Sequence, residues 1–232
     1  MTDEPTAYRQ FRFTLPPGGT DLLLVRHGES APARADQPFP LVDGHGDPPL
    51  APDGEREAEL VGDRLAIEPI DAIYVSGLRR TVQTGAPLAK RLDLAPNVEP
   101  GLREVRLGEW EGGLFRIKVA KGDDLAVRMF TTQRWDVIPG AESTEDLAAR
   151  VRAAIERITA AHPDQRVAVF THGGVIGQIV SMATGAAPFA FIDADNASIT
   201  QLVVVGDRWI VRRFNDTAHL HPAFTVRAEP PA

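Results

Sequence analysis

The sequence predicts an α/β protein, with a three-layer, doubly wound and mostly parallel sheet, helices on both of its faces and a C-terminal hairpin. Along the 232 residues, short apolar runs alternate with segments of helical periodicity, which is typical of parallel sheets covered by helices. Two apolar runs, at 22–25 and 167–170, lead within two residues into a His-Gly pair, at His27 and His172. This pattern places imidazoles at the carboxyl edge of the sheet, where open α/β sheets bind ligands.

The composition restricts the possible partners and chemistry. The net charge of −7 and the pI near 5.4 disfavour binding to nucleic acid or to an anionic membrane surface. With no cysteine, the chain has no disulfide, thiol nucleophile or cysteine-based zinc site. It also has no signal-peptide pattern and no apolar run near the ~20 residues of a membrane span, so we expect a soluble, cytoplasmic protein. We expect a single domain at 20–232, preceded by an N-terminal segment, 1–19, that leads into the first strand.

The first half of the predicted domain is a βαβ unit. The strand at 22–25 is followed by a Pro-, Gly- and Asp-rich segment at 31–49, which reads as a loop. Pro52 then opens a helix, and a strand follows at 72–75. The chain therefore returns to the same sheet through a crossover helix.

The middle of the chain holds a second helix and an irregular insertion. The helix, from about 78 to 92, is expected to kink or restart at Pro87, whose ring nitrogen cannot donate a helical hydrogen bond. Residues 105–140 have no clear period, and we expect them to form a basic lid. We assign the walls of the ligand pocket to 31–49 and 105–140. The basic residues of the second segment are Arg106, Arg116, Lys118, Lys121, Arg128 and Arg134.

The last third of the chain completes the sheet. Ser143 and Asp146 resemble a capping box, and the helix that they open ends at His162-Pro163. The strand that leads to His172 is followed by a helix at 175–183. The closing hairpin pairs strands at 199–205 and 209–214 across a Gly-Asp turn.

The residues around the two histidines match the needs of a phosphate monoester dianion. Arg26 adjoins His27, and Arg80 follows the second strand, so two guanidinium groups can fork onto phosphate oxygens. Nearby cations also disfavour imidazolium, which keeps His27 neutral and able to attack phosphorus. His172 completes the cage, and the absence of a side chain at Gly173 lets the phosphate approach the backbone. His45, His162, His219 and His221 lack metal-ligand spacing, and we expect them to be exposed.

Glu104 is the best candidate for the acid that protonates the leaving alcohol. It follows a short strand region at Val98 and precedes the Gly-rich run 108–113. We hypothesise that His27 forms a phosphohistidine while Glu104 protonates the departing oxygen. Glu104 then deprotonates the water that hydrolyses the intermediate, and no metal or other cofactor is required.

These segments resemble the histidine phosphatase superfamily, also called the phosphoglycerate mutase-like family. The resemblance runs in order from about residue 22 to 214, and its motifs are Arg26-His27-Gly28-Glu29-Ser30, the segment 76–84, Glu104 with 108–112, the segment 139–143, Thr171-His172-Gly173-Gly174 and the segment 196–200. It implies a doubly wound sheet, His27 as the phosphorylated nucleophile and Glu104 as the proton donor. Arg26, Arg80 and His172 become phosphate ligands by the same resemblance.

Departures from the family pattern favour a phosphatase of small soluble phosphomonoesters. The mutases of the family carry an asparagine six residues after the nucleophile, where this chain has Ala33. They also carry a Glu-Arg-His-Tyr-Gly run where this chain has Glu104-Val105-Arg106-Leu107-Gly108. A mutase remains the alternative, as does a member that binds phosphate without turnover. The oligomeric state stays open, with a homo-oligomer as one possibility.

A different class of phosphatase is also conceivable. Residues 191–196 imitate the aspartate nucleophile motif of magnesium-dependent haloacid dehalogenase-like phosphatases. That motif needs further catalytic segments downstream, and the remaining chain is too short to hold them. Insensitivity of the activity to EDTA would dismiss this alternative.

Overall fold

The core of the molecule is a six-stranded sheet with the strand order β5-β4-β6-β1-β7-β8. The computed structural model describes residues 10–221. The first four strands in this order are mutually parallel, whereas β7 runs antiparallel to both β1 and β8. The predicted α/β class and the C-terminal hairpin are therefore confirmed. The strands are β1 (Thr20–Arg26), β4 (Ala72–Val75), β5 (Asn97–Val98), β6 (Arg166–Thr171), β7 (Ile199–Val205) and β8 (Arg208–Asp216).

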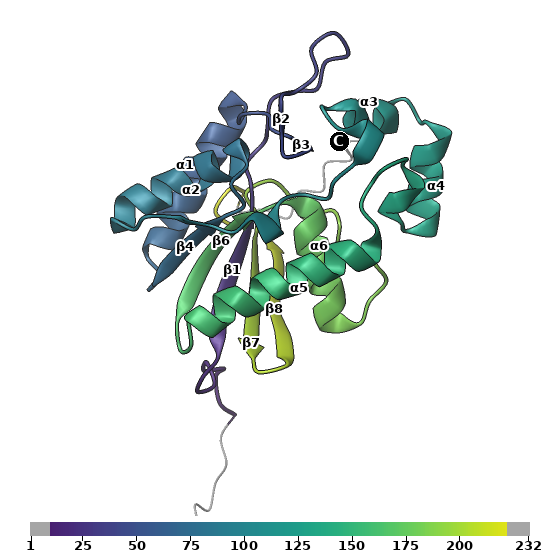
Figure 1. Ribbon diagram of the computed structural model, residues 1–232. Helices are drawn as coiled ribbons and strands as arrows, with labels where there is room; N and C mark the ends of the chain where they lie inside the picture. Colours follow the sequence, from purple (N-terminus) through teal and green to yellow (C-terminus); the bar gives the residue numbers. More distant parts are fainter. Residues whose placement is uncertain (1–9, 222–232) are drawn as a thin grey trace, which may run out of the picture.

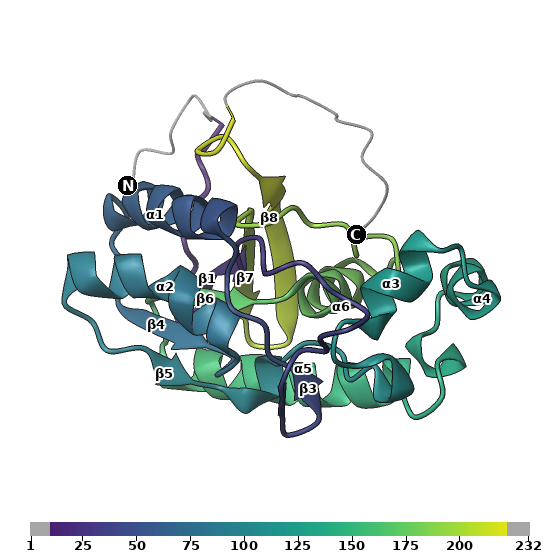
Figure 2. The same cartoon turned by 90° about the horizontal axis from the view of Figure 1, so that it is seen from above.

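Helices cover both faces of this sheet (Figure 1). Alternate side chains of β1 explain the two layers, because Leu23 and Val25 pack with one core cluster and Leu22 and Leu24 with the other. Viewed from above, α1 and α2 lie on one side of the strands and α5 on the other (Figure 2). The first cluster includes residues of α1 and α2, and the second includes residues of α5 and α6. These helices are α1 (Pro52–Ala66), α2 (Arg79–Leu92), α5 (Thr144–Ala161) and α6 (Gly173–Thr184).

Of two helix features predicted from the sequence, the cap at Ser143 is confirmed and the restart at Pro87 is wrong. Ser143 caps α5 as expected, since its side chain accepts a hydrogen bond from the backbone N–H of Asp146. The expected restart at Pro87 is wrong, because α2 is one helix from Arg79 to Leu92. A Cβ atom at Gly62 would lie 2.9 Å from Cβ of Pro87, so the missing side chain on α1 makes room for the proline ring. Packing against α1 thus keeps α2 continuous across Pro87.

The segment 105–140 is helical where we expected irregular structure. It contains α3 (Leu114–Ala120) and α4 (Asp124–Thr132), together with short 3-10 turns at Gly108–Trp110 and Trp135–Val137; a further 3-10 turn precedes it at Pro100–Leu102. Asp123 caps α4 by accepting a hydrogen bond from the backbone N–H of Leu125, and Met129 anchors that helix in the core. The correction is therefore that tertiary packing orders this insertion into helices.

The expected loop at 31–49 carries a small hairpin of its own. Its strands are β2 (Leu41–Val42) and β3 (His45–Gly46). In Figure 1 this hairpin and α3 stand over the end of the sheet where β1 finishes. Both insertions thus lie over the carboxyl edge, as a pocket wall must.

The strand register brings the two His-Gly pairs together. Arg26 at the end of β1 pairs with Thr171 at the end of β6, so the residues that follow, His27 and His172, leave the sheet side by side. Close backbone approach fixes the loop after His27, because a Cβ atom at Gly28 would lie 2.5 Å from the carbonyl oxygen of Gly54 in α1. Within residues 10–221, no helix has the length and apolar character needed to cross a membrane.

Candidate active site

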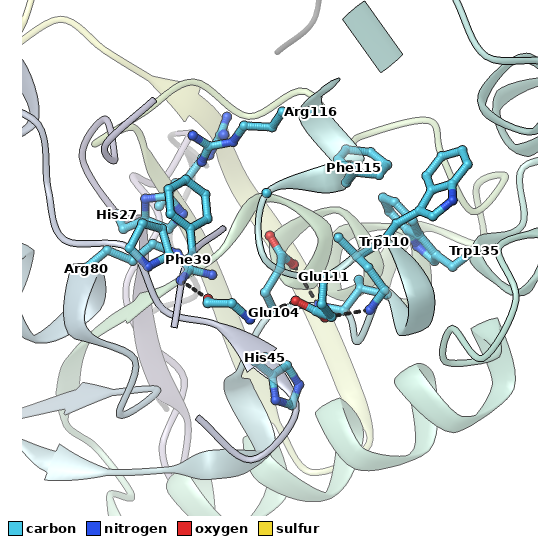
Figure 3. A pocket seen from close by; sticks show the side chains of 16 residues that line it. His27, Phe39, His45, Arg80, Glu104, Trp110, Glu111, Phe115, Arg116 and Trp135 are labelled. Atoms are coloured by element: carbon cyan, nitrogen blue, oxygen red, sulfur yellow. Dashed lines mark hydrogen bonds between the residues drawn. The ribbon is translucent and has the colours of Figure 1, made fainter. Parts of the chain in front are cut away.

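A cavity of about 150 Å³ opens at this edge of the sheet and is lined by 16 residues (Figure 3). Four of the predicted site residues, Arg26, His27, Arg80 and Glu104, are among them. His172 is fully buried beside His27, and neither it nor Gly173 lines the cavity. The rest of the wall comes from 39–48 and 105–135, within the two segments that the sequence assigns to it.

The backbone and the ring of His27 are both held by hydrogen bonds. Its backbone N–H donates to the carbonyl of Thr171 at 3.0 Å, and its carbonyl accepts from Nδ2 of Asn196 at 2.9 Å. Nδ1 of the ring lies 2.7 Å from the carbonyl oxygen of Gly28. A carbonyl can only accept, so Nδ1 carries the proton and Nε2 of the neutral ring keeps its lone pair.

The electrostatic surroundings keep His27 neutral. Burial lowers the pKa of His27 well below its usual value, and the guanidinium groups of Arg80 and Arg26 lower this pKa further. A neutral imidazole with a free Nε2 is a nucleophile that is ready at neutral pH.

His172 packs edge-on against His27, with the ring centroids 5.1 Å apart. Its Nε2 lies 2.8 Å from the hydroxyl oxygen of Ser76, whereas its Nδ1 is buried and has no hydrogen-bond partner within the described residues. Burial lowers the pKa of His172 well below its usual value, with Arg80 and then His27 acting in the same direction. Both histidines are thus neutral in the ligand-free protein.

Three guanidinium groups surround the His27 end of the cavity. Arg26 donates from Nη1 to the carbonyl of Ala194, while its Nε is buried without a partner in the described part of the chain. Arg80 donates from Nη1 to the carbonyl of Gly46 at 2.9 Å, and burial lowers its pKa to about 10. Arg116, which reaches the site from α3, is the third. It donates to Oγ of Ser30 at 2.6 Å and to the carbonyl of Ala31 at 3.0 Å.

Glu104 lies against the N-terminus of α6. Its Oε1 accepts a hydrogen bond from the backbone N–H of Val105 at 3.0 Å, and its Oε2 lies 3.5 Å from the backbone nitrogen of Gly174. A Cβ atom at Gly174 would lie 2.7 Å from Oε1, so glycine is needed there to admit the carboxylate. The hydrogen bond from Val105 and the space at Gly174 therefore fix the carboxylate at the edge of the cavity.

Arg150 of α5 holds the loop that carries Glu104. Its guanidinium donates to the carbonyls of Gly101 and Arg103 at 2.8 Å and to that of Glu104 at 3.0 Å. It also binds both carboxylate oxygens of Glu142. This network ties the position of Glu104 to the helix behind it.

Several residues of the cavity wall were not predicted individually. His45 was expected to be exposed, but the cavity wall half-buries it, and burial lowers its pKa. His162 and His219 are also half-buried, contrary to expectation, whereas His221 is exposed. The other unpredicted wall residues include Phe39, Trp110, Glu111, Phe115 and Trp135.

Metal-ligand geometry is not found at this site or elsewhere in residues 10–221, where no group of three or more His, Cys, Asp or Glu side chains could hold an ion. Asp193 and Asp195 of the imitated aspartate motif do not line the cavity.

Comparison with known proteins places the chain in one family. The model of the histidine phosphatase superfamily, branch 1, matches residues 22–217. A metal-independent phosphoserine phosphatase of Arabidopsis thaliana is 31% identical over 205 residues, which are 87% of this chain and 83% of that protein. Phosphoglycerate mutase-like protein 4 of the same plant is also 31% identical, over 204 residues and 86% of each chain. Relatives thus carry the names of phosphatases and of mutases.

Solved structures agree with this placement. A mycobacterial glucosyl-3-phosphoglycerate phosphatase superposes with a TM-score of 0.69 at 26% identity, over 85% of this chain and 99% of that one. A phosphoglycerate mutase from Bacillus anthracis superposes with a TM-score of 0.71 over 88% of this chain and 96% of that one, and at 21% identity it supports the fold alone.

Proposed function

Because the chain belongs to the histidine phosphatase superfamily, branch 1, we propose that it hydrolyses small phosphomonoesters with His27 as its nucleophile. The observation that carries the proposal is the hydrogen bond from Nδ1 of His27 to the Gly28 carbonyl, which leaves Nε2 as the attacking atom. The arginines beside the ring suit a phosphate dianion, because guanidinium groups match the geometry of its oxygens.

In the first step, Nε2 of His27 bonds to phosphorus while the bond from phosphorus to the ester oxygen breaks. Arg26 and Arg80 neutralise the charge on the three remaining oxygens. Nε of Arg26 is buried without a partner among residues 10–221, and a phosphate oxygen would satisfy it. Glu104, protonated when the dianion is bound, donates its proton to the departing alkoxide, so a neutral alcohol leaves.

In the second step, water attacks the phosphorus of the phosphohistidine. Glu104, now ionised, accepts a proton from that water as the bond from phosphorus to Nε2 breaks. Inorganic phosphate is released, and the neutral imidazole of His27 is regenerated. Every proton transfer uses a side chain of this chain, so we expect phosphate release to be insensitive to EDTA.

A mutase is the second candidate, because relatives such as phosphoglycerate mutase-like protein 4 carry that name. It would differ in passing the phosphoryl group from His27 to an alcohol instead of to water. Ala33 and the Glu104-Val105-Arg106-Leu107-Gly108 run, which depart from the mutase motifs, favour the hydrolase.

The test is release of inorganic phosphate from p-nitrophenyl phosphate by the wild type and by His27→Ala. We expect turnover by the wild type and its loss in the variant. Turnover by neither protein would favour a binding module. Interconversion of phosphoglycerates that depends on 2,3-bisphosphoglycerate and outpaces phosphate release would establish the mutase.

A further inference from the structure

The two ends of the cavity differ in chemistry. His27, Arg80 and Arg116 occupy one end, and Trp110, Phe115 and Trp135 gather at the other (Figure 3). The side chains of Glu104 and Glu111 lie between them. If phosphate binds at His27, the aromatic end receives the alcohol portion of the ester.

The aromatic end is a preformed apolar surface. The ring of Phe115 lies 6.3 Å from that of Trp110 and 6.1 Å from that of Trp135, measured between centroids. Both indoles are buried, at 4% and 8% exposure, so their positions are set by the core. Phe115 is half-buried and lines the cavity. A flat apolar group of a substrate would exchange water for aromatic contacts here.

Glu111, which lies between the two ends, disfavours a second anionic group on the substrate. Glu111 accepts hydrogen bonds from the backbone N–H groups of Leu107 and Gly46, both at 2.7 Å, and no Lys or Arg among residues 10–221 pairs with it. Its carboxylate group therefore lies in the path of the alcohol without a paired cation. A carboxylate on the substrate would be repelled by this group.

The basic residues of 105–140 do not offset this repulsion. Of the six, only Arg116 lines the cavity, and it lies at the phosphate end, with its guanidinium 5.8 Å from the ring of Phe39. Lys118, which lies over Trp110, is paired with Asp123 at 2.8 Å. Arg134 is paired with Asp136 and Glu145. The aromatic end is thus left without a free cation among the described lining residues.

From this division we propose that the preferred substrates are phosphomonoesters of uncharged alcohols that carry one aromatic or apolar ring, and that phosphorylated hydroxy acids are disfavoured. The inference rests on the proposed function, since it takes the His27 end as the phosphate site. The cavity volume of about 150 Å³ suits an alcohol with roughly one six-membered ring.

The test compares kcat/KM for benzyl phosphate, ethyl phosphate and 3-phosphoglycerate, all of which release an aliphatic alkoxide. Benzyl phosphate is expected to exceed ethyl phosphate about tenfold, which reports the ring, and 3-phosphoglycerate to fall at least tenfold below ethyl phosphate, which reports the charge. Equal or reversed rankings would overturn the inference while leaving the hydrolase function intact.

Variants test whether the aromatic end and Glu111 cause these differences in kcat/KM. Phe115→Ala is expected to lower kcat/KM for benzyl phosphate about fivefold to tenfold and to change that for ethyl phosphate less than twofold. Phe130→Ala is the matched control, because Phe130 is an aromatic residue of α4 that lies outside the cavity and is 36% exposed. Glu111→Gln is expected to raise kcat/KM for 3-phosphoglycerate severalfold without raising that for benzyl phosphate. Equal effects of Phe115→Ala on benzyl and ethyl phosphate would contradict the assignment.

A binding measurement separates this inference from the proposed function. Benzylphosphonate and ethylphosphonate cannot be hydrolysed, and their binding can be followed by the fluorescence of Trp110 and Trp135, which line the site. If benzylphosphonate binds about tenfold more tightly than ethylphosphonate, and Phe115→Ala abolishes this difference, the aromatic end binds the ring even if no ester is hydrolysed. Equal affinity for the two phosphonates overturns the inference.

Discussion

The hydroxyl oxygen of Ser76 lies 2.8 Å from Nε2 of His172, and this contact sets the tautomer of the histidine. The hydroxyl of Thr81 donates to the carbonyl of Leu78 at 2.8 Å, so at the 3.0 Å contact between the two hydroxyls Ser76 is the donor. Ser76 must then accept from Nε2–H of His172. Nδ1 is the nitrogen that remains for a ligand, and in the neutral ring it has no proton to donate.

Anion binding at this site is therefore expected to take up a proton on Nδ1 of His172. Sulfate is a suitable dianion, because it does not titrate near neutral pH. Its affinity should weaken up to about tenfold for each pH unit between pH 6.5 and 8, which corresponds to one linked proton. Ser76→Ala and His172→Gln should each reduce this dependence. A sulfate Kd that does not change with pH in the wild type would contradict the uptake of a proton by His172.

The sequence contained most of the information about this end of the site. The two His-Gly pairs follow adjacent parallel strands, and the pairing of Arg26 with Thr171 is what brings the histidines together. That both histidines lie at one edge of the sheet can be read from the apolar runs alone, because parallel strands share a carboxyl edge. Nothing in the sequence indicated that Ser76 would lie against His172, since that contact depends on how β4 is placed beside β6.

Glu104→Gln should lower kcat/KM, which reports the steps up to the release of the alcohol, according to how much the leaving group needs a proton. With benzyl phosphate, whose alkoxide is strongly basic, we expect a loss of about 10²-fold to 10⁴-fold. With p-nitrophenyl phosphate the loss should be much smaller, because a nitrophenolate departs without protonation. Glu109→Gln is the control, since Glu109 is exposed and lies outside the cavity. An equal loss on both substrates would indicate that Glu104 positions the phosphate and is not the acid.

Arg150→Met should destabilise the protein and displace Glu104. The change removes a guanidinium that satisfies three backbone carbonyls and leaves Glu142, which is 7% exposed, without its partner. We expect the free energy of unfolding to fall by about 3 kcal/mol, measured by urea denaturation. Arg152→Met, on the exposed side of the same helix, should change it by less than about 1 kcal/mol. Equal losses in the two variants would contradict the anchoring role of Arg150.

Acidification should destabilise the ligand-free protein. The pKa values of His27 and His172 are lowered in the folded state, chiefly by burial. Below the unfolded pKa of about 6.5 the unfolded chain takes up protons that the folded protein does not, so the free energy of unfolding falls as the pH falls. Two such groups give a slope of up to about 2.7 kcal/mol per pH unit, from about pH 6.5 down to the folded pKa values.

Urea denaturation at pH 7.5, 6.5 and 5.5 measures this slope, and His27→Gln should reduce it by removing one of the two groups. A free energy of unfolding that stays constant or rises between pH 6.5 and 5.5 would mean that the histidines are not held neutral by the fold.

The cavity wall shows where sequence patterns are insufficient. Helix α3 has only seven residues, too few for an apolar period to stand out, and none of them is fully buried. Arg116 enters the site because α3 folds back over the loop after His27, a contact between Arg116 and Ser30 across 86 positions of sequence. In α4 a signal was present, since Asp123 precedes Leu125, Ala126 and Met129 at helical spacing. Short helices of this kind are ordered by what they pack against.

The central claim is a covalent bond between Nε2 of His27 and the phosphorus of a substrate, and rapid-quench trapping tests it most directly. The enzyme is mixed with p-nitrophenyl phosphate, quenched in alkali within milliseconds to preserve phosphohistidine, digested and mapped by mass spectrometry. The account predicts a phosphoryl group on His27 that forms and decays at rates consistent with turnover. It predicts no phosphoryl group in the His27→Ala variant, in which Glu104 is unchanged. A phosphoryl group on another residue, or phosphate release that persists in His27→Ala, would contradict it.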